Sequence, residues 1–241
     1  ARHRHVNVPH VPIERSRNPA VGGSSSRRRR GAVASLARCA MLRDVAVDPK
    51  VIWHEYLQSA RDVMLWKLEG LTEYDIRRPL VSTSTNLLGL VRHVTCTEIG
   101  YFGVVFGRPF EEPLTWRSDR EVNGDMWVRS HETTQSVVSM YRRVWAHSDE
   151  TISALRLDAV GEVPWWPEGD RELSLAQAMV HVISDVYRHA GHADVIRELV
   201  DGAVGSDPRW SNMPAADDTF WTALRDRVED AARRADQSPR E

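Results

Sequence analysis

The chain has 241 residues, 41% of them hydrophobic and 27% charged, with a formal net charge of −2 at pH 7. This composition supports a buried core, and no apolar run reaches the roughly 18 residues of a membrane-spanning helix. Residues 1–40 hold nine Arg and one Glu, so the rest of the chain is acidic, which argues against a nucleic-acid-binding surface. With only two Cys there is no disulfide framework, so we expect a cytoplasmic protein.

Residues 1–47 contain the tracts RHRH, GGSSS and RRRR and little apolar periodicity. Such a segment cannot bury enough surface to offset the entropy of ordering it. The Arg run at 27–30 is typical of a targeting or nucleic-acid patch, but also of a solvated tail or of sequence upstream of a start at Met41. We expect residues 1–47 to form a disordered basic extension and residues 48–241 to form the folded domain.

Apolar periodicity and capping residues predict helices in the folded part. The expected ranges are 48–70, 86–106, 130–157, 173–200 and 215–235. The first begins at an Asp-Pro pair, Asp48 and Pro49, and ends at Gly70. No run of alternating residues predicts a strand, so the expected fold is an all-α four-helix bundle with an extra C-terminal helix. The long links 107–129 and 158–172 are of a kind that often shapes the mouth of a site.

The expected helix 173–200 carries the segment HVISDVYRHAGHAD. Asp185, His189 and His192 follow His181 at +4, +8 and +11, so at about 100° per residue the four share one edge of the helix. Asp185 and His189 lie nearest the apolar stripe. They are one turn apart, a spacing that lets a carboxylate and an imidazole bind the same ion.

His93 is the best candidate for a third ligand, because it lies midway along the expected helix 86–106 on an apolar face. Two His and one carboxylate leave coordination positions open for water or substrate. Hydrogen-bonded core histidines and solvated helix charges produce the same pattern, so spacing alone leaves that alternative open. Glu98 and Arg188 are candidates for pairing beside the site, although solvated charges are the commoner outcome.

Three separated segments, NLLGLVRHVTCTEIGYFGVVFGRPF, VPWWP and HVISDVYRHAGHADVIREL, resemble the DinB/YfiT-like superfamily of metalloenzymes, in an actinobacterial branch. The resemblance spans about residues 48–236. It implies a four-helix bundle in which one His of the second helix joins two ligands of a later helix around a divalent metal. His93, Asp185 and His189 match these positions. His192 stands where many relatives carry Gln, so we expect it, and His181, beside the centre.

The resemblance implies a mycothiol-dependent S-transferase, in which the metal activates a small thiol for attack on an electrophile. Zinc is the expected metal, since His and carboxylate ligands suit it. Trp165 and Trp166 are interpreted either as walls of the substrate pocket or as a cover for the bundle end. Two other functions stay open: a bundle with a structural metal or none that binds a small ligand or partner, and a thiol-dependent isomerase of a small acid, with Arg92 and Arg188 as its basic residues. A homodimer is possible.

Overall fold

The computed structural model describes residues 48–112, 121–209 and 211–237. The predicted extension at 1–47, with its Arg run at 27–30, lies outside the described residues. The boundary between Val47 and Asp48 therefore stays a prediction.

Helix α2 (Pro49–Trp66) begins where the Asp-Pro pair predicts it. The Asp48 carboxylate accepts a hydrogen bond from the backbone N–H two residues later at 2.9 Å, and Pro49 is the first helical residue. The helix ends at Trp66, earlier than the sequence predicts. Arg197 donates to the carbonyl of Trp66 and to two carbonyls beyond that end, and Gly70 occupies the left-handed region (φ +76°) of the following turn. Gly70, which the sequence predicts as the end of the helix, therefore lies in the turn that follows the helix.

The predicted helix 86–106 is one continuous helical path with three hydrogen-bonding patterns. It begins as α4 (Leu87–Glu98), where the Asn86 side chain accepts from the N–H of Gly89 at 2.8 Å. It continues as a π-helical turn, η1 (Ile99–Gly103), and a short 3-10 turn, η2 (Val104–Phe106). Apolar periodicity does not distinguish an α turn from a π turn, so this change was not predicted.

The two remaining long helices lie close to their expected ranges. α5 (Thr134–Ala154) and α6 (Leu175–Asp201) start and stop within a few residues of the predictions. α6 begins with a capping box, in which the Ser174 and Gln177 side chains each bond the other's backbone N–H. It ends at Gly202, which has φ +77°.

The prediction that the folded part lacks strands is wrong for one segment. β1 (Val160–Glu162) pairs antiparallel with β2 (Glu172–Ser174), so the link before α6 is a small hairpin. A short helix, α3 (Glu73–Arg77), also lies in the predicted link between α2 and α4. Each element has five residues or fewer, too short for periodicity to reveal.

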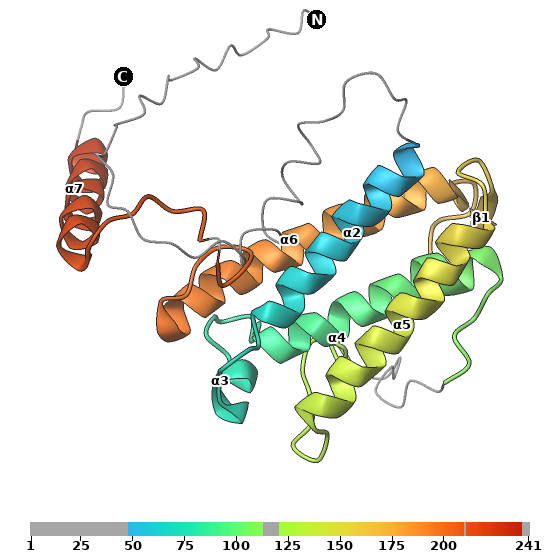
Figure 1. The fold of residues 1–241 in the computed structure, drawn as a ribbon, viewed down its shortest axis with the longest axis horizontal. Coiled ribbons are helices and arrows are strands. Elements are labelled where there is room, and N and C mark those ends of the chain that lie inside the picture. Colours follow the sequence, from blue (N-terminus) through green and yellow to red (C-terminus); the bar gives the residue numbers. More distant parts are fainter. Residues whose placement is uncertain (1–47, 113–120, 210, 238–241) are drawn as a thin grey trace, which may run out of the picture. The chain divides into compact units, whose positions relative to one another are not determined.

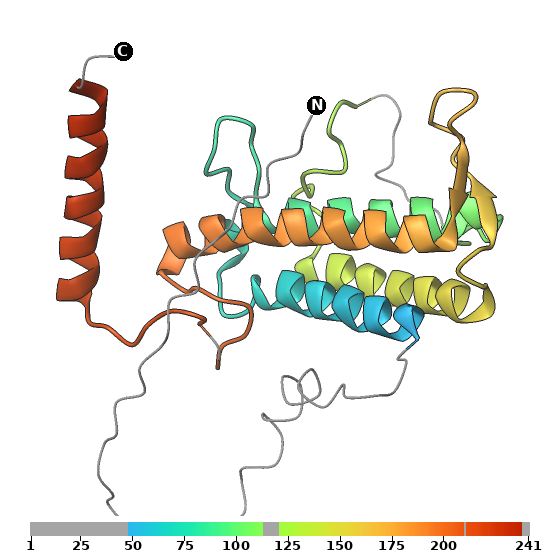
Figure 2. The ribbon, with the colours of Figure 1, turned by 90° about the horizontal axis from the view of Figure 1, so that it is seen from above.

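The helices α2, α4, α5 and α6 run side by side as a four-helix bundle, confirming the expected fold class (Figures 1 and 2). Figure 2 shows α6 and α4 in one layer over α2 and α5 in the other. The core between them consists of apolar side chains that are at most 2% exposed, among them Leu57, Met64, Leu88, Leu90, Val94, Phe102, Tyr141, Met179, Val182 and Val186. Among the described residues, no helix combines the length and apolarity needed to cross a membrane.

The extra C-terminal helix is α7 (Asp218–Gln237). The sequence predicts packing through its apolar stripe of Phe220, Trp221, Leu224 and Val228. None of the side chains of α7 is buried: Phe220 and Val228 are 44% and 62% exposed, whereas Trp221 and Leu224 are half-buried. The helix is therefore confirmed, but its apolar stripe is only partly covered.

Candidate metal centre

Three layers of facing side chains join α4 and its π turn to α6. The pairs are His93 with His189 (ring centroids 4.6 Å apart), Thr97 with Asp185 (Oγ1 to Oδ2, 3.2 Å) and Tyr101 with His181 (ring centroids 4.4 Å apart). The numbers rise along one helix and fall along the other, so the two helices are antiparallel. Successive layers are four residues apart, which corresponds to about 6 Å along a helix axis.

The first two layers bring the three predicted ligands together. One ligand-type atom each from His93, Asp185 and His189 lies within 4.8 Å of the other two. Within α6, His189 Nε2 is 3.5 Å from Asp185 Oδ1, as expected for residues one turn apart. The side chains of His93, Asp185 and His189 are 27%, 26% and 13% exposed. The cluster therefore lies at the surface of the helix pair and is open to solvent on one side.

Asp125 is a further residue of this site that the sequence did not reveal. Its Oδ2 is 2.7 Å from Nδ1 of His93. Because an ionised carboxylate only accepts hydrogen bonds, Nδ1 of His93 is the donor and its Nε2 is the nitrogen left available to bind a cation. Asp125 lies in the link 107–129, which was predicted to shape the site mouth, but no spacing rule connects a loop residue to a helix residue.

The charges of the cluster favour an ionised carboxylate. Burial opposes charge on His93, but the hydrogen bond and charge of Asp125 and the charge of Asp185 raise the pKa of His93 above its ordinary value. Burial likewise opposes charge on Asp185, but bonding to His189 and the two nearby imidazoles lower its pKa. The site thus holds a carboxylate that attracts positive charge, either a proton on an imidazole or a cation.

The third layer lies beside Trp165 and Trp166, for which the sequence left open a pocket wall or a cover for the bundle end. Tyr101 contacts Trp165 and Trp166 edge-on, with ring centroids 5.5 and 6.3 Å away, and Trp166 lies 6.1 Å from the exposed His181. The two Trp residues lie between β1 and β2. A Cβ added to Gly100 would be only 3.1 Å from the Trp165 indole, so that ring rests directly on the π turn.

Comparison with known proteins places the chain in a family. A family model described as Mycothiol-S-transferase matches residues 53–202, which is more than half of the chain. The chain belongs to the mycothiol S-transferase family, which is DinB-like. A solved structure described as the conserved protein of locus from Enterococcus faecalis matches with a TM-score of 0.50 and 15% identity, over 65% of this chain and 99% of that one. That likeness supports the DinB-like helical fold. No curated protein matches the chain.

His192 of this mycothiol S-transferase family member lies against the ligand cluster. Its Nδ1 is 3.4 Å from Nδ1 of His189, at the side of that ring away from Asp185. Burial and the charges of His189 and Arg188 lower the pKa of His192. The structure therefore places His192 next to a ligand residue without placing it in the ligand group.

Two charged residues considered for this site are not part of it. Glu98 is fully buried and accepts two hydrogen bonds from Arg61, at 3.0 and 2.6 Å, so it is neither a solvated charge nor a partner of the ligands. Arg92 is 1% exposed, where it donates to the Trp127 carbonyl and to Glu132. Helix position alone did not reveal these burials, because the partners come from other elements.

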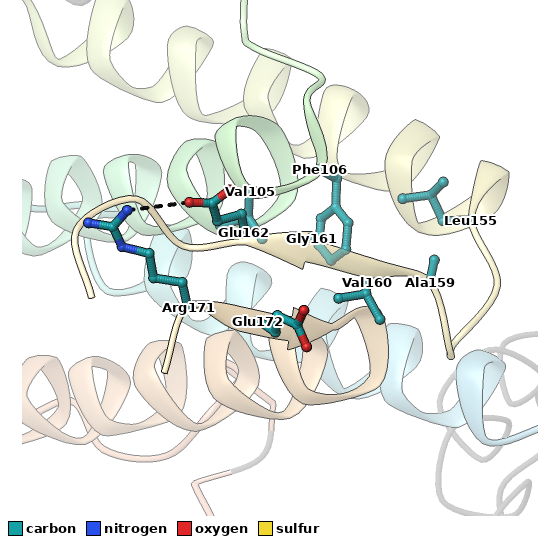
Figure 3. A pocket seen from close by; sticks show the side chains of 9 residues that line it. All are labelled: Val105, Phe106, Leu155, Ala159, Val160, Gly161, Glu162, Arg171 and Glu172. Atoms are coloured by element: carbon teal, nitrogen blue, oxygen red, sulfur yellow. Dashed lines mark hydrogen bonds and ion pairs between the residues drawn. The ribbon is translucent and has the colours of Figure 1, made fainter. Parts of the chain in front are cut away.

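A hollow of about 560 Å³ lies elsewhere in the domain, under the hairpin (Figure 3). Its lining residues are Val105, Phe106, Leu155, Ala159, Val160, Gly161, Glu162, Arg171 and Glu172. Glu162 and Arg171 form an ion pair at 3.4 Å across its rim. None of these residues belongs to the ligand cluster or contacts it through an observed bond. Its lining offers no imidazole or thiol.

Proposed function

We propose that this chain is a metal-dependent S-transferase that uses mycothiol to attack electrophilic small molecules. The observation that carries the proposal is the partly exposed group of His93, Asp185 and His189, held between two helices of a mycothiol S-transferase family member. Family membership supports the thiol substrate. The side-chain group supports the metal dependence.

The donor set fits a divalent cation, and zinc best. Two imidazoles and one carboxylate match the three protein ligands that catalytic zinc sites use, with a further position for a small molecule. Two of the three are oriented by neighbours: His93 by Asp125, and Asp185 by the hydroxyl of Thr97. Such support is typical of metal ligands, because it fixes the tautomer and the direction of the lone pairs.

A bound cation would lower the pKa of a coordinated thiol and keep its sulfur as the nucleophilic thiolate. The chain's own residues then need only to orient the reactants. The thiol proton is released to solvent, the sulfur electron pair forms the new S–C bond, and the leaving group departs with the electrons of the broken bond. The open side of the cluster is where both small molecules can enter.

The two alternative functions are less well supported by the geometry. A structural metal site is usually closed by four protein ligands, whereas this group has three and is partly exposed. The second alternative, isomerisation of a small acid, would use Arg92 and Arg188 as the basic residues that bind the acid. Arg92 is buried in its own ion pair, which removes one of the two. The cytoplasmic location and a homodimer remain part of the proposal.

The test is a rate measurement with purified protein, zinc, mycothiol and a model electrophile. We expect wild type to form the S-conjugate well above the uncatalysed rate, and His189→Ala to lose at least about 100-fold together with its bound zinc. His54→Ala is the matched control, since His54 also pairs with an Asp at 2.7 Å but lies on α2. A wild-type rate equal to background would overturn the proposal.

A further inference from the structure

Trp165 is largely exposed to solvent, although its indole ring packs against two residues of the π turn. Its indole rests on Gly100 and meets Tyr101 edge-on, yet the residue is 45% exposed. The backbone around it is anchored, because Val163 is fully buried and its N–H donates to the Arg171 carbonyl at 2.8 Å. A large aromatic surface is therefore held rigidly in contact with solvent, which is a feature of ligand sites.

The π turn is what aligns this aromatic layer with the metal ligands. In an α-helix, residues four apart differ in direction by about 40°, so Tyr101 would rotate progressively away from the face of His93. A π turn is wider, so each of its residues turns the chain by less than an α-helical residue does, and the step from Thr97 in α4 to Tyr101 in η1 loses part of that rotation. Tyr101 accordingly meets His181 on α6, in line with the layers of Thr97 and His93.

The layer spacing sets the distance between the aromatic residues and the reacting sulfur. Tyr101 and His181 lie one layer beyond Asp185, which is about 6 Å along the helices. A ring-sized molecule lying on this layer therefore has its edge beside the ligand cluster. His181, which is exposed, and Trp165 supply the accessible aromatic surface.

We propose that Trp165, which shares the Tyr101 ring with His181, is the shelf on which the electrophile binds, and that it selects planar, electron-poor aromatic electrophiles. This inference rests on the proposed function. The indole face is electron-rich, so it stacks favourably on an electron-poor ring. The family's thiol chemistry fixes what happens at the cluster, whereas the shelf determines which electrophile reaches it.

The corresponding reaction with 1-chloro-2,4-dinitrobenzene balances without another reactant. The mycothiol sulfur forms a bond to the ring carbon that carries chlorine, and chloride leaves with the electrons of the C–Cl bond. The thiol proton passes to solvent. 2-Chloroacetamide reacts with loss of the same leaving group but has no ring, so it is the matched small electrophile.

The first experiment compares kcat/KM for these two electrophiles in zinc-loaded wild type, Trp165→Ala and Trp165→Phe. We expect Trp165→Ala to lower the value for the dinitrobenzene about tenfold and to change that for chloroacetamide less than about twofold. Trp165→Phe keeps an aromatic face and should lose about threefold or less. Tyr56→Ala, which removes a 52% exposed ring from α2, should change neither value. If Trp165→Ala lowers kcat/KM equally for both electrophiles, or does not lower it for the dinitrobenzene, the proposed binding role of Trp165 is wrong.

The second experiment separates failure of the shelf from failure of the proposed function. 1,3-Dinitrobenzene has no leaving group, so its binding is measured by saturation-transfer NMR without mycothiol. We expect a signal with wild type and Tyr56→Ala that is lost with Trp165→Ala at unchanged zinc content. If no variant transfers any thiol, this binding result still decides the shelf: loss in Trp165→Ala supports it, and equal signals in all variants overturn it.

Discussion

Asp125 Oδ2 lies 2.7 Å from Nδ1 of His93, so a loop residue determines which nitrogen of that imidazole faces the ligand cluster. His93 comes from α4 and Asp125 from the segment after it, 32 residues further along the chain. The pair makes the third ligand dependent on the position of a loop.

Removal of Asp125 should weaken metal binding without removing a ligand. We expect Asp125→Ala to raise the zinc dissociation constant about 10- to 100-fold, because the imidazole loses the acceptor that fixes its tautomer and orientation. Asp125→Asn keeps an acceptor oxygen without the charge, so its effect should be smaller. Zinc titration with a competing chelator measures both.

His54 and Asp149 provide the matched control, because they form a His–Asp pair of the same length away from the cluster. Asp149→Ala should leave zinc affinity unchanged. Equal dissociation constants for wild type and Asp125→Ala would show that the 2.7 Å contact plays no part in holding the metal.

The sequence predicted the candidate ligands but missed a residue that supports one of them. Spacing on one helix explains why Asp185 and His189 lie one turn apart, but it does not by itself assign them to a metal. His93 needed both its helix face and the family resemblance, because nothing in the sequence states which helices are neighbours. Asp125 was missed, since the direction of a loop depends on contacts formed only after folding.

The same reasoning explains what was right and wrong in the fold. Helix starts were predictable, because Asp48, Asn86 and Ser174 cap their helices through local bonds. The π turn at 99–103 and the hairpin at 160–174 were not. Both depend on packing between distant segments: a Cβ on Gly161 would come within 2.4 Å of the Val105 carbonyl.

Gly89 tests whether the loop must approach α4 closely. A Cβ on Gly89 would lie 1.8 Å from the Met126 carbonyl oxygen, so Gly89→Ala must displace the segment that carries Asp125. We expect a loss of about 1–3 kcal/mol in unfolding free energy and weaker zinc binding. Denaturant unfolding and zinc titration measure these two effects.

Gly191 is the matched control for that substitution. It also lies within a helix, but an added Cβ would meet nothing within 4 Å. Gly191→Ala should therefore stabilise the protein by about 0.5–1 kcal/mol through helix propensity. If Gly89→Ala is as well tolerated as Gly191→Ala, the close packing of the loop is not needed.

The Arg61–Glu98 pair tests the buried polar centre of the bundle. Both side chains are 0% exposed and share two hydrogen bonds, so Glu98→Ala leaves a buried guanidinium with two of its four hydrogen bonds, those to Gln58 and Asp149. We expect a loss of about 3–5 kcal/mol. The double variant Arg61→Met/Glu98→Leu should lose less than Glu98→Ala alone, because it removes both charges. A double variant as unstable as the single one would show that lost packing, and not the buried charge of Arg61 without Glu98, is responsible.

Asp149 should make part of the stability depend on pH in the acid range. Burial by itself would raise the pKa of Asp149, but the hydrogen bond with His54 and the Arg61 guanidinium outweigh it and hold the pKa below its ordinary value. A carboxyl group whose pKa is lowered on folding stabilises the native state above its unfolded pKa, and that contribution disappears as the pH falls through the folded value. The loss therefore occurs below about pH 4.

Asp149→Asn isolates this contribution from those of other carboxylates. Because Asp149 is 33% exposed, the difference at neutral pH should be modest, about 0.5–1 kcal/mol, with wild type the more stable. The unfolding free energies of the two proteins should then converge as the pH falls below about 4, since the wild-type carboxylate takes up a proton there and the amide does not. Denaturant unfolding at a series of pH values measures the convergence. Parallel curves over that range would mean that Asp149 has the same pKa in the folded and unfolded chain, and that its bonds to His54 and Arg61 do not stabilise the bundle.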